Sequence, residues 1–244
     1  GRIVRRLKAP AKKGMNRITW DFRYPSPGPV TFRVPVSYNV YDVLEKGYAA
    51  MPGNYSVTMG KIEDGKYTEL TQAQSFKAVA LNASALSATD KNALDAFAKS
   101  VSDLRRQISS TDAYRDELAG KIKFMKAAAL DALESGSEIV EAVYTVERRL
   151  KEFNLKLNGD NIRDKHQFER APSVSDRIGQ IEYSIWNATA APTETQKQSL
   201  AVVAKQAPAL MDELKALDTE IKRIETMLER GKAPYTPGRM PEKK

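Results

Sequence analysis

The sequence predicts an α+β protein of two modules, an antiparallel β-sandwich over residues 1–80 and an antiparallel four-helix bundle over residues 85–231. Two observations predict this fold class. In the first 80 residues, apolar side chains alternate with polar ones over short stretches, which is the period of a strand with one buried face. From residue 85 onward, apolar residues recur at spacings of three and four, which is the period of an amphipathic helix.

The clearest strand signal lies in residues 14–24, where Ile18, Trp20 and Phe22 alternate with polar or charged residues. We expect this stretch to form the core strand of a small, immunoglobulin-like sandwich, with Trp20 among its largest buried side chains. Residues 1–8 also have the character of a strand, and a short loop joins them to the Trp20 strand.

The rest of the first module alternates turn signals with strand signals. The prolines of residues 25–35 predict an extended loop or an edge segment. A Pro-Gly turn at 52–53 leads into a strand that contains Tyr55. Asp64-Gly65 predicts a hairpin, because these residues accept the positive φ angles of a tight turn. The returning strand is expected over 67–80, with a break near its middle.

Four apolar stripes predict four helices, over about 89–134, 138–157, 173–188 and 193–230. The heptad register of the first stripe continues without interruption through Ser109–Asp112, so we expect one long helix with a polar layer rather than two helices. Thr89 or Asp90 is expected to cap its start, and Gly136 to end it.

The connections between the helices differ in length. Residues 158–172 are expected to form a long crossing loop, whereas Thr193 is expected to cap the last helix, with Gln196 at the capping-box position. Pro208 interrupts the hydrogen bonds of that helix and predicts a kink. Residues 232–244 are expected to be an extended or mobile tail. The stripes favour an antiparallel bundle that closes on itself. The alternatives are an open coiled-coil stalk and a bundle completed by a second chain.

The composition limits the class of protein. A fraction of 41% hydrophobic and 29% charged residues is typical of a globular chain. No run of about 18 apolar residues indicates a membrane span, and the first residues do not have the pattern of a signal peptide. Cysteine is absent, which excludes disulfides and thiolate chemistry. Because the chain begins without Met on strand-like sequence, we expect it to be the C-terminal piece of a longer protein.

The net charge of +8 is concentrated near the two ends of the sequence. Residues 1–33 hold nine Lys and Arg against one acidic residue, and residues 230–244 hold five against one. Two interpretations remain: a patch that binds anions, or a solvated strand face beside a partner domain. The second is favoured, and a nucleic-acid partner is not expected, because the helical region between the basic ends is mildly acidic.

No catalytic constellation stands out in the sequence. His166 lies near Asp164 and Glu169, but with no second His and no Cys it is better interpreted as a structural or exposed residue than as a metal ligand or a base. The carboxylates of the helices have the spacing of solvent-facing pairs with Lys and Arg. We therefore expect no catalytic residue, no cofactor and no metal site.

A candidate ligand or partner surface is made of aromatic residues around the proline-rich loop and of nearby arginines. Its members are Tyr24, Phe32, Tyr38, Tyr41, Tyr48, Arg5, Arg6, Arg17 and Arg23. Exposed aromatics of this kind stack on sugar rings or peptides. The same residues also serve to anchor loops on a small core, which requires no ligand and is the favoured interpretation.

Three pieces of the sequence follow one another in a familiar order: Asn16-Arg-Ile-Thr-Trp-Asp-Phe-Arg23, then Met51-Pro-Gly-Asn-Tyr55-Ser-Val57, then a strand with Phe76. This order resembles the C-terminal region of bacterial sortilin-like, BNR-repeat propeller proteins, which are common in Bacteroidota and often labelled glycosyl hydrolases. The final Pro192-Thr193 joint and last long helix also resemble that family. The chain departs from the pattern at Met51, where a proline is usual, and in the loop over 29–45.

The resemblance implies an exported protein, located in the periplasm, at the outer-membrane surface or outside the cell. The family's propeller lies outside this sequence, so none of its site residues carries over. The expected function is that of a non-catalytic accessory module that supports the propeller of its parent chain and contacts protein partners in a cell-envelope assembly. The alternatives are a module that contributes sugar contacts to a sialidase-like glycoside hydrolase, or an anion-binding module that uses the basic N-terminal strands.

Overall fold

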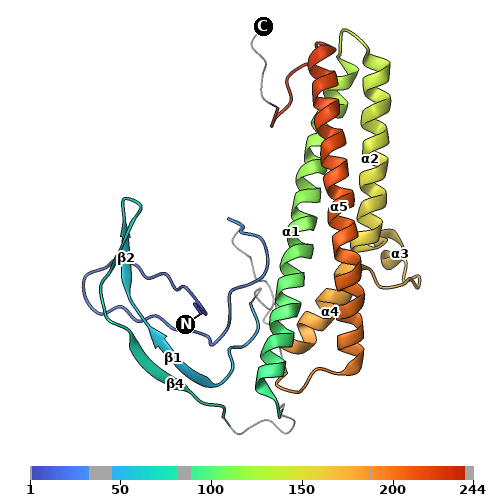
Figure 1. The fold of residues 1–244 in the computed structure, drawn as a ribbon. Helices are drawn as coiled ribbons and strands as arrows, with labels where there is room; N and C mark the ends of the chain where they lie inside the picture. The colour runs from blue at the N-terminus through green and yellow to red at the C-terminus, as the bar shows by residue number, and fades with distance from the viewer. Residues whose placement is uncertain (1, 33–45, 82–88, 187, 240–244) are drawn as a thin grey trace.

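The computed structural model describes residues 2–32, 46–81, 89–186 and 188–239, and it has a mixed α+β fold. Figure 1 shows an N-terminal unit with short strands beside an elongated unit of helices. The elements, in chain order, are β1 (Gly53–Val57), β2 (Gly60–Glu63), β3 (Lys66–Glu69), β4 (Gln74–Ala78), α1 (Lys91–Leu130), α2 (Gly136–Asn158), α3 (Asn161–Lys165), α4 (Val174–Trp186) and α5 (Glu194–Arg230).

The strands form two separate antiparallel pairs. β1 pairs with β4, with Tyr55 opposite Phe76, and β2 pairs with β3. The β2–β3 hairpin turns at Asp64 and Gly65, whose φ angles are 48° and 77°, so the predicted Asp-Gly hairpin is confirmed. The return from β3 to β4 breaks between residues 69 and 74, near the middle of the predicted strand. No second sheet layer covers either pair within the described residues, so the expected sandwich is not shown as such.

The strands expected over residues 1–8 and 14–24 are absent, and these predictions were wrong. The described part of both segments is irregular, apart from a single bridge between Arg23 and Ala49. Phe22 has a φ of 55°, a left-handed conformation that a strand residue does not adopt. The chain therefore turns at Phe22 instead of continuing along β1.

Trp20 nevertheless packs where the sequence places it, against the Tyr55 strand. Its ring centroid lies 5.3 Å from that of Tyr55, 6.3 Å from Phe76 and 4.7 Å from Phe22. Trp20 and Tyr55 are half-buried, not fully buried as expected. These four aromatic rings hold the β1–β4 sheet and the preceding segment together.

α1 is the single long helix that the heptad register predicts. Asp90 caps its start, since its Oδ1 accepts a hydrogen bond from the amide of Ala93 at 2.9 Å. Thr111, within the expected polar layer, is buried and donates to the carbonyl oxygen of Gln107 at 2.8 Å. A polar residue inside the apolar stripe is thus satisfied by its own helix.

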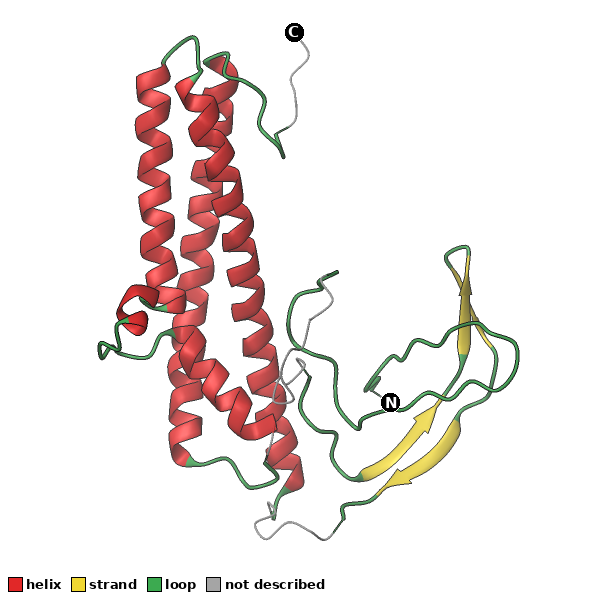
Figure 2. Ribbon diagram, turned by 180° about the vertical axis from the view of Figure 1, so that it is seen from behind, coloured by secondary structure: helices red, strands yellow, loops and turns green. Residues whose placement is uncertain are grey.

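The long helices share one apolar core. α1 and α5 contact each other along their length, and both contact α2 and α4. At about 1.5 Å per residue, α1 spans about 60 Å, whereas α2 spans about 35 Å and α4 about 20 Å. Figures 1 and 2 show α2 beside one end of the α1–α5 pair and α4 beside the other. The two shorter helices thus follow one another along the longer pair.

Two helix boundaries differ from the prediction. Gly136 begins α2 instead of ending the first helix, and the left-handed residue at this turn is Ser135, with a φ of 54°. The expected crossing loop at 158–172 contains the short helix α3, capped by Asp160. The capping box of Thr193 and Gln196 is confirmed.

The described part of the C-terminal tail, residues 232–239, has no helix or strand and packs against the helices. Ala233 packs against the core, and Thr236 is buried. Arg239 is also buried, and its Nη2 lies 3.4 Å from Glu229 of α5. The kink predicted at Pro208, which lies inside α5, stays a prediction.

Candidate functional site

The joint between the N-terminal unit and the helices is built on three aromatic residues. Tyr24 and Tyr48 stack with ring centroids 4.3 Å apart, and Tyr48 meets Trp186 edge-on at 5.7 Å. Tyr48 is only 4% exposed and belongs to the same core as the helices. Burial raises its pKa, so its hydroxyl stays neutral at physiological pH. Through Tyr48 the first unit inserts into the core of the second.

Hydrogen bonds to the C-terminal end of α4 fix this joint. Arg23 Nη1 donates to the carbonyl oxygens of Gly47 at 3.2 Å and Trp186 at 3.1 Å. The last carbonyls of a helix have no partner within the helix and favour a cation, so the guanidinium satisfies one of them. In return, the indole Nε1 of Trp186 donates to the carbonyl oxygen of Lys46.

Two more arginines hold Tyr24 from the other side. Arg5 Nη1 donates to the carbonyl oxygen of Tyr24 at 2.8 Å. The guanidinium of Arg2 lies 4.9 Å from the centre of the Tyr24 ring, donates to its hydroxyl and lies 3.6 Å from Asp95 of α1. The hydrogen bond to Tyr24 raises the pKa of Arg2. The arginines of the joint are therefore engaged within the chain.

Gly47 permits the close approach of the two segments at this joint. A Cβ atom at this position would lie 2.3 Å from the carbonyl oxygen of Pro25 and 2.4 Å from that of Tyr24. Backbone atoms cannot move away as a flexible side chain can. The joint therefore requires glycine at residue 47.

The predicted ligand surface divides into two groups. Tyr24, Tyr48, Arg5 and Arg23 form the joint, and the face of Tyr48 is not available to a ligand. This corrects the idea of a continuous aromatic surface, because stacking and burial already use these rings. Arg6, Arg17 and Phe32 are exposed, and Phe32 is 100% exposed. Tyr38 and Tyr41 lie outside the described residues.

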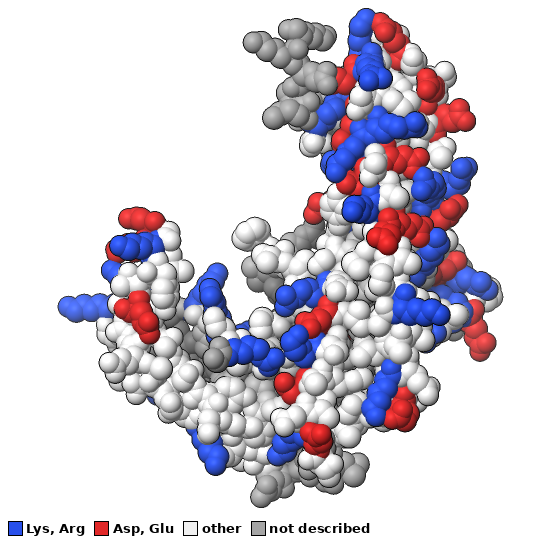
Figure 3. Space-filling view, viewed as in Figure 1, with Lys and Arg blue, Asp and Glu red and all other residues white. Residues whose placement is uncertain are grey.

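A second feature, which the sequence did not predict as a site, is the exposed apolar side of the β1–β4 sheet. Many large apolar residues of the N-terminal unit are exposed, among them Val57 at 55% and Phe76 at 38%. In Figure 3 the lower surface of this unit is mostly uncharged, whereas Lys and Arg side chains gather in the hollow between the unit and the helices. Alternation in the Tyr55 strand is the signal of such a face in the sequence, but alternation alone does not distinguish a face that the chain buries from one that it leaves exposed.

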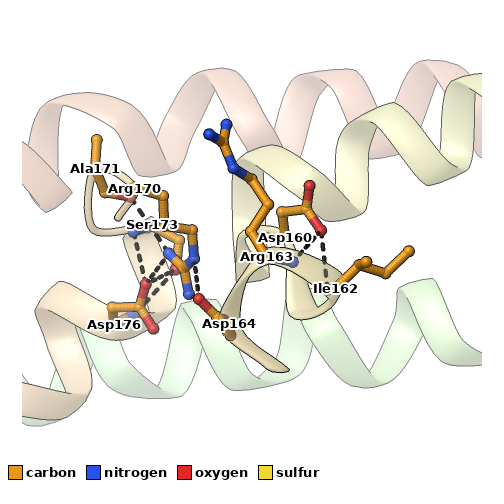
Figure 4. Close-up of polar contacts among 8 residues, drawn as sticks. All are labelled: Asp160, Ile162, Arg163, Asp164, Arg170, Ala171, Ser173 and Asp176. Atoms are coloured by element: carbon orange, nitrogen blue, oxygen red, sulfur yellow. Dashed lines mark hydrogen bonds and ion pairs between the residues drawn. The ribbon is translucent and has the colours of Figure 1, made fainter. Parts of the chain in front are cut away.

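The segment around His166 forms a structural clamp. Asp164 pairs with Arg170 at 2.6 Å and not with His166, and Asp176 accepts from Arg170 Nη1 at 2.5 Å. Figure 4 shows the Arg170 guanidinium between the two carboxylates. The hydrogen bond from Arg170 lowers the pKa of Asp164. Both carboxylates are thus ionised and paired with Arg170, and these ion pairs tie α3 to the start of α4.

A surface pocket of about 450 Å³ lies between α1 and α5. Tyr114, Asp218, Leu214 and Arg106 are part of its lining. Burial and the neighbouring Asp218 raise the pKa of Tyr114 to about 12. Burial opposes ionisation of Asp218, but hydrogen bonds from Lys222 and Tyr114 outweigh it and lower its pKa. At neutral pH neither group is poised to exchange a proton.

Within the residues that the structure describes, no three His, Asp or Glu side chains lie close enough together to hold a metal ion. None of the described helices is long and apolar enough to cross a bilayer. No family model, curated protein or solved structure matches the chain. The likeness to sortilin-like propeller proteins therefore rests on the motifs quoted from the sequence.

Proposed function

We propose that this chain is a non-catalytic interaction module, in which the N-terminal unit docks on a neighbouring folded domain and the helices act as a rigid spacer about 60 Å long. On the motif resemblance, the neighbour is the propeller of a longer, exported parent protein, and the assembly belongs to the cell envelope. The helical surface is then available to further protein partners.

One observation carries this proposal: the two units bury their apolar residues to very different extents. The helices bury most of theirs, and residues such as Val143, Leu217 and Ile221 are fully buried. Burying one such side chain contributes about 1.5–3 kcal/mol. The N-terminal unit leaves most of its large apolar side chains in water, which is typical of a surface that another protein covers.

The charge distribution supports the same assignment. Residues 2–32 and 46–81 hold twelve Lys and Arg against four Asp and Glu. The helices and the tail, over 89–239, hold equal numbers of the two kinds. The N-terminal unit thus has both the exposed apolar residues and an excess of positive charge, and a partner with carboxylates around an apolar patch would complement it.

The finer description of the fold belongs to the same proposal. The β1–β4 sheet has the exposed apolar face of one half of an immunoglobulin-like sandwich, and we infer that residues 1–80 form the complete sandwich with strands that the docked domain supplies. The helices α1, α2, α4 and α5 are proposed to form an antiparallel four-helix bundle that closes on itself, since they share a core.

The direct test mixes the purified chain with the separately produced domain encoded upstream of Gly1. Titration calorimetry is expected to give a 1:1 complex. Val57→Asp, at a half-exposed position on the apolar face, is expected to weaken it at least tenfold. Ser56→Asp is the matched control, because this neighbouring residue points to the opposite side of the strand and should leave binding unchanged. Absence of a complex, or equal binding by both variants, would contradict the proposal.

A second candidate is anion binding at the hollow of Figure 3, where Lys and Arg side chains gather. Arg6 and Arg17 are exposed and have charges available for such a role. A heparin titration at increasing salt tests it, because affinity that depends on ion pairs falls steeply with ionic strength. An affinity independent of salt, or no binding, would remove this candidate.

A further inference from the structure

The β1–β4 sheet has two faces of opposite character. The antiparallel register places Tyr55 opposite Phe76 and Gly53 opposite Ala78, on one face. Val57 lies opposite Gln74 on the same face, which is therefore apolar except at Gln74. The intervening residues point to the other face, and they are all polar: Asn54, Ser56, Ser75 and Lys77. We call these the apolar face and the polar face of the sheet.

Among the described residues, an aromatic cluster covers one end of the apolar face. The Trp20 ring packs on Tyr55 and Phe76, and Phe22 packs on Trp20. Val57, at the other end of β1, remains 55% exposed, and Met59, the next residue in the alternation, is also exposed. An apolar strip therefore continues beyond the aromatic cluster into solvent.

The sheet also has an open edge. β4 pairs with β1 alone, and its other edge has no partner strand in the described part of the chain. Figure 2 shows β4 on the outside of the N-terminal unit. A sheet of two strands is only marginally stable, and unpaired backbone groups at an edge are a template for another strand. The edge of β4 is therefore suited to an added strand, whose side chains on the apolar face would lie beside Gln74, Phe76 and Ala78.

The charge beside the β4 edge indicates which kind of strand would bind there. Lys77 lies on the polar face of β4, next to the open edge, and is exposed. A strand added at this edge places alternate side chains beside Phe76 on one face and beside Lys77 on the other. Apolar residues fit the positions beside Phe76, and acidic residues fit the positions beside Lys77. The excess of Lys and Arg over this unit favours the same choice.

We propose that the edge of β4 binds an extended strand, contributed by the neighbouring protein domain, in which apolar residues alternate with acidic ones. The backbone of the added strand continues the sheet, its apolar side chains extend the apolar face, and its carboxylates pair with Lys77. This inference rests on the proposed function and adds the mode of docking and the chemistry of the partner.

The test uses the full chain and three eight-residue peptides as probes: a blocked (Glu-Val)₄, a blocked (Lys-Val)₄, and a block peptide of four Glu followed by four Val. Binding is followed by fluorescence anisotropy of labelled peptide at low micromolar concentration. (Glu-Val)₄ is expected to bind at least tenfold more tightly than either of the others, and to slow amide hydrogen exchange in residues 74–78.

The charge assignment is tested by Lys77→Glu, at an exposed position whose change removes no core packing. This variant is expected to reverse the preference, so that (Lys-Val)₄ binds more tightly than (Glu-Val)₄. Lys61→Glu, in the separate β2–β3 sheet, is the control and should keep the wild-type preference. Equal binding of all three peptides, or an unchanged preference in Lys77→Glu, would overturn the proposal.

Failure here is distinguishable from failure of the proposed function. If the upstream domain forms a complex that Val57→Asp weakens but none of the peptides binds, docking uses the apolar face without an added strand, and only the further inference fails. If neither the domain nor the peptide binds, both fail.

Discussion

Arg23 donates a hydrogen bond to the carbonyl oxygen of Trp186, 163 residues later in the chain, at 3.1 Å. The same nitrogen reaches Gly47, so one guanidinium joins three segments that are distant in the sequence. The indole Nε1 of Trp186 also donates a hydrogen bond to the carbonyl oxygen of Lys46. The orientation of the N-terminal unit on the helices therefore depends on a few polar contacts around one buried tyrosine, Tyr48.

Arg23→Ala is expected to loosen this joint. It leaves two partly buried carbonyl oxygens without a charged donor, and such a loss costs about 1–3 kcal/mol. Thermal unfolding should show a lower Tm, and small-angle X-ray scattering a larger radius of gyration. Arg17→Ala, at an exposed position, is the control and should change neither quantity. Identical curves for both variants would show that the joint does not depend on Arg23.

Gly47→Ala should be more damaging than its size suggests. The added methyl carbon meets two backbone carbonyl oxygens at 2.3 and 2.4 Å, so the segment that contains Tyr24 must move. We expect a loss of about 1–3 kcal/mol in the free energy of unfolding, the usual cost of overpacking. At Gly120 in α1, an added Cβ atom would meet no atom within 4 Å apart from its chain neighbours and the backbone of its own helix. Gly120→Ala should therefore raise the free energy of unfolding by about 0.5–1 kcal/mol. Urea titration of both variants tests this difference in sign.

The helices were predictable from the sequence because their signals are local and repeat many times. The stripe of Leu210, Leu214, Leu217 and Ile221 fixes one buried face of α5, and the capping box fixes where it begins. The short helix α3 was missed because five residues show no period. Gly136 was misplaced because glycine favours both ends of a helix, and Ser135 took the left-handed position instead.

The N-terminal unit was harder to predict because its contacts are not local. Alternation around Trp20 showed correctly that this side faces Tyr55, but it could not show that Phe22 adopts a positive φ and ends the ladder. The joint could not be predicted from the sequence for the same reason, because Tyr48 and Arg23 contact Trp186, which is far from them in the sequence. Both residues were in the predicted surface, and the structure gives them an internal role.

Thr193→Ala is expected to fray the start of α5. The Thr193 hydroxyl accepts from the amide of Gln196, whose side chain accepts from the amide of Thr193 and donates to Ser184 of α4. Loss of such a cap costs about 1 kcal/mol. Thr219→Ala, in the exposed middle of the same helix, is the control and should be neutral or slightly stabilising. Chemical denaturation should separate the two variants, and equal midpoints would argue against a role for the cap.

Arg170→Gln is expected to make the free energy of unfolding depend less on pH in the acidic range. Arg170 pairs with Asp164 and Asp176, and it lowers the pKa of Asp164. Burial opposes ionisation of Asp176, but the hydrogen bonds from Arg170 and Ser173 outweigh it, so its pKa is also lowered. A carboxylate with a lowered pKa contributes stability above its ordinary pKa of 3.8, and this contribution is lost as the pH falls through the lowered value.

The wild type should therefore exceed Arg170→Gln in unfolding free energy by a constant amount between about pH 5 and 7, and the gap should narrow below pH 3.8. Arg163→Gln is the matched control, since Figure 4 shows the Arg163 guanidinium pointing away from both carboxylates of the clamp. This control should follow the wild type at every pH. A gap that stays constant down to pH 2 would mean that Arg170 stabilises the α3–α4 connection by packing and not through the two carboxylates.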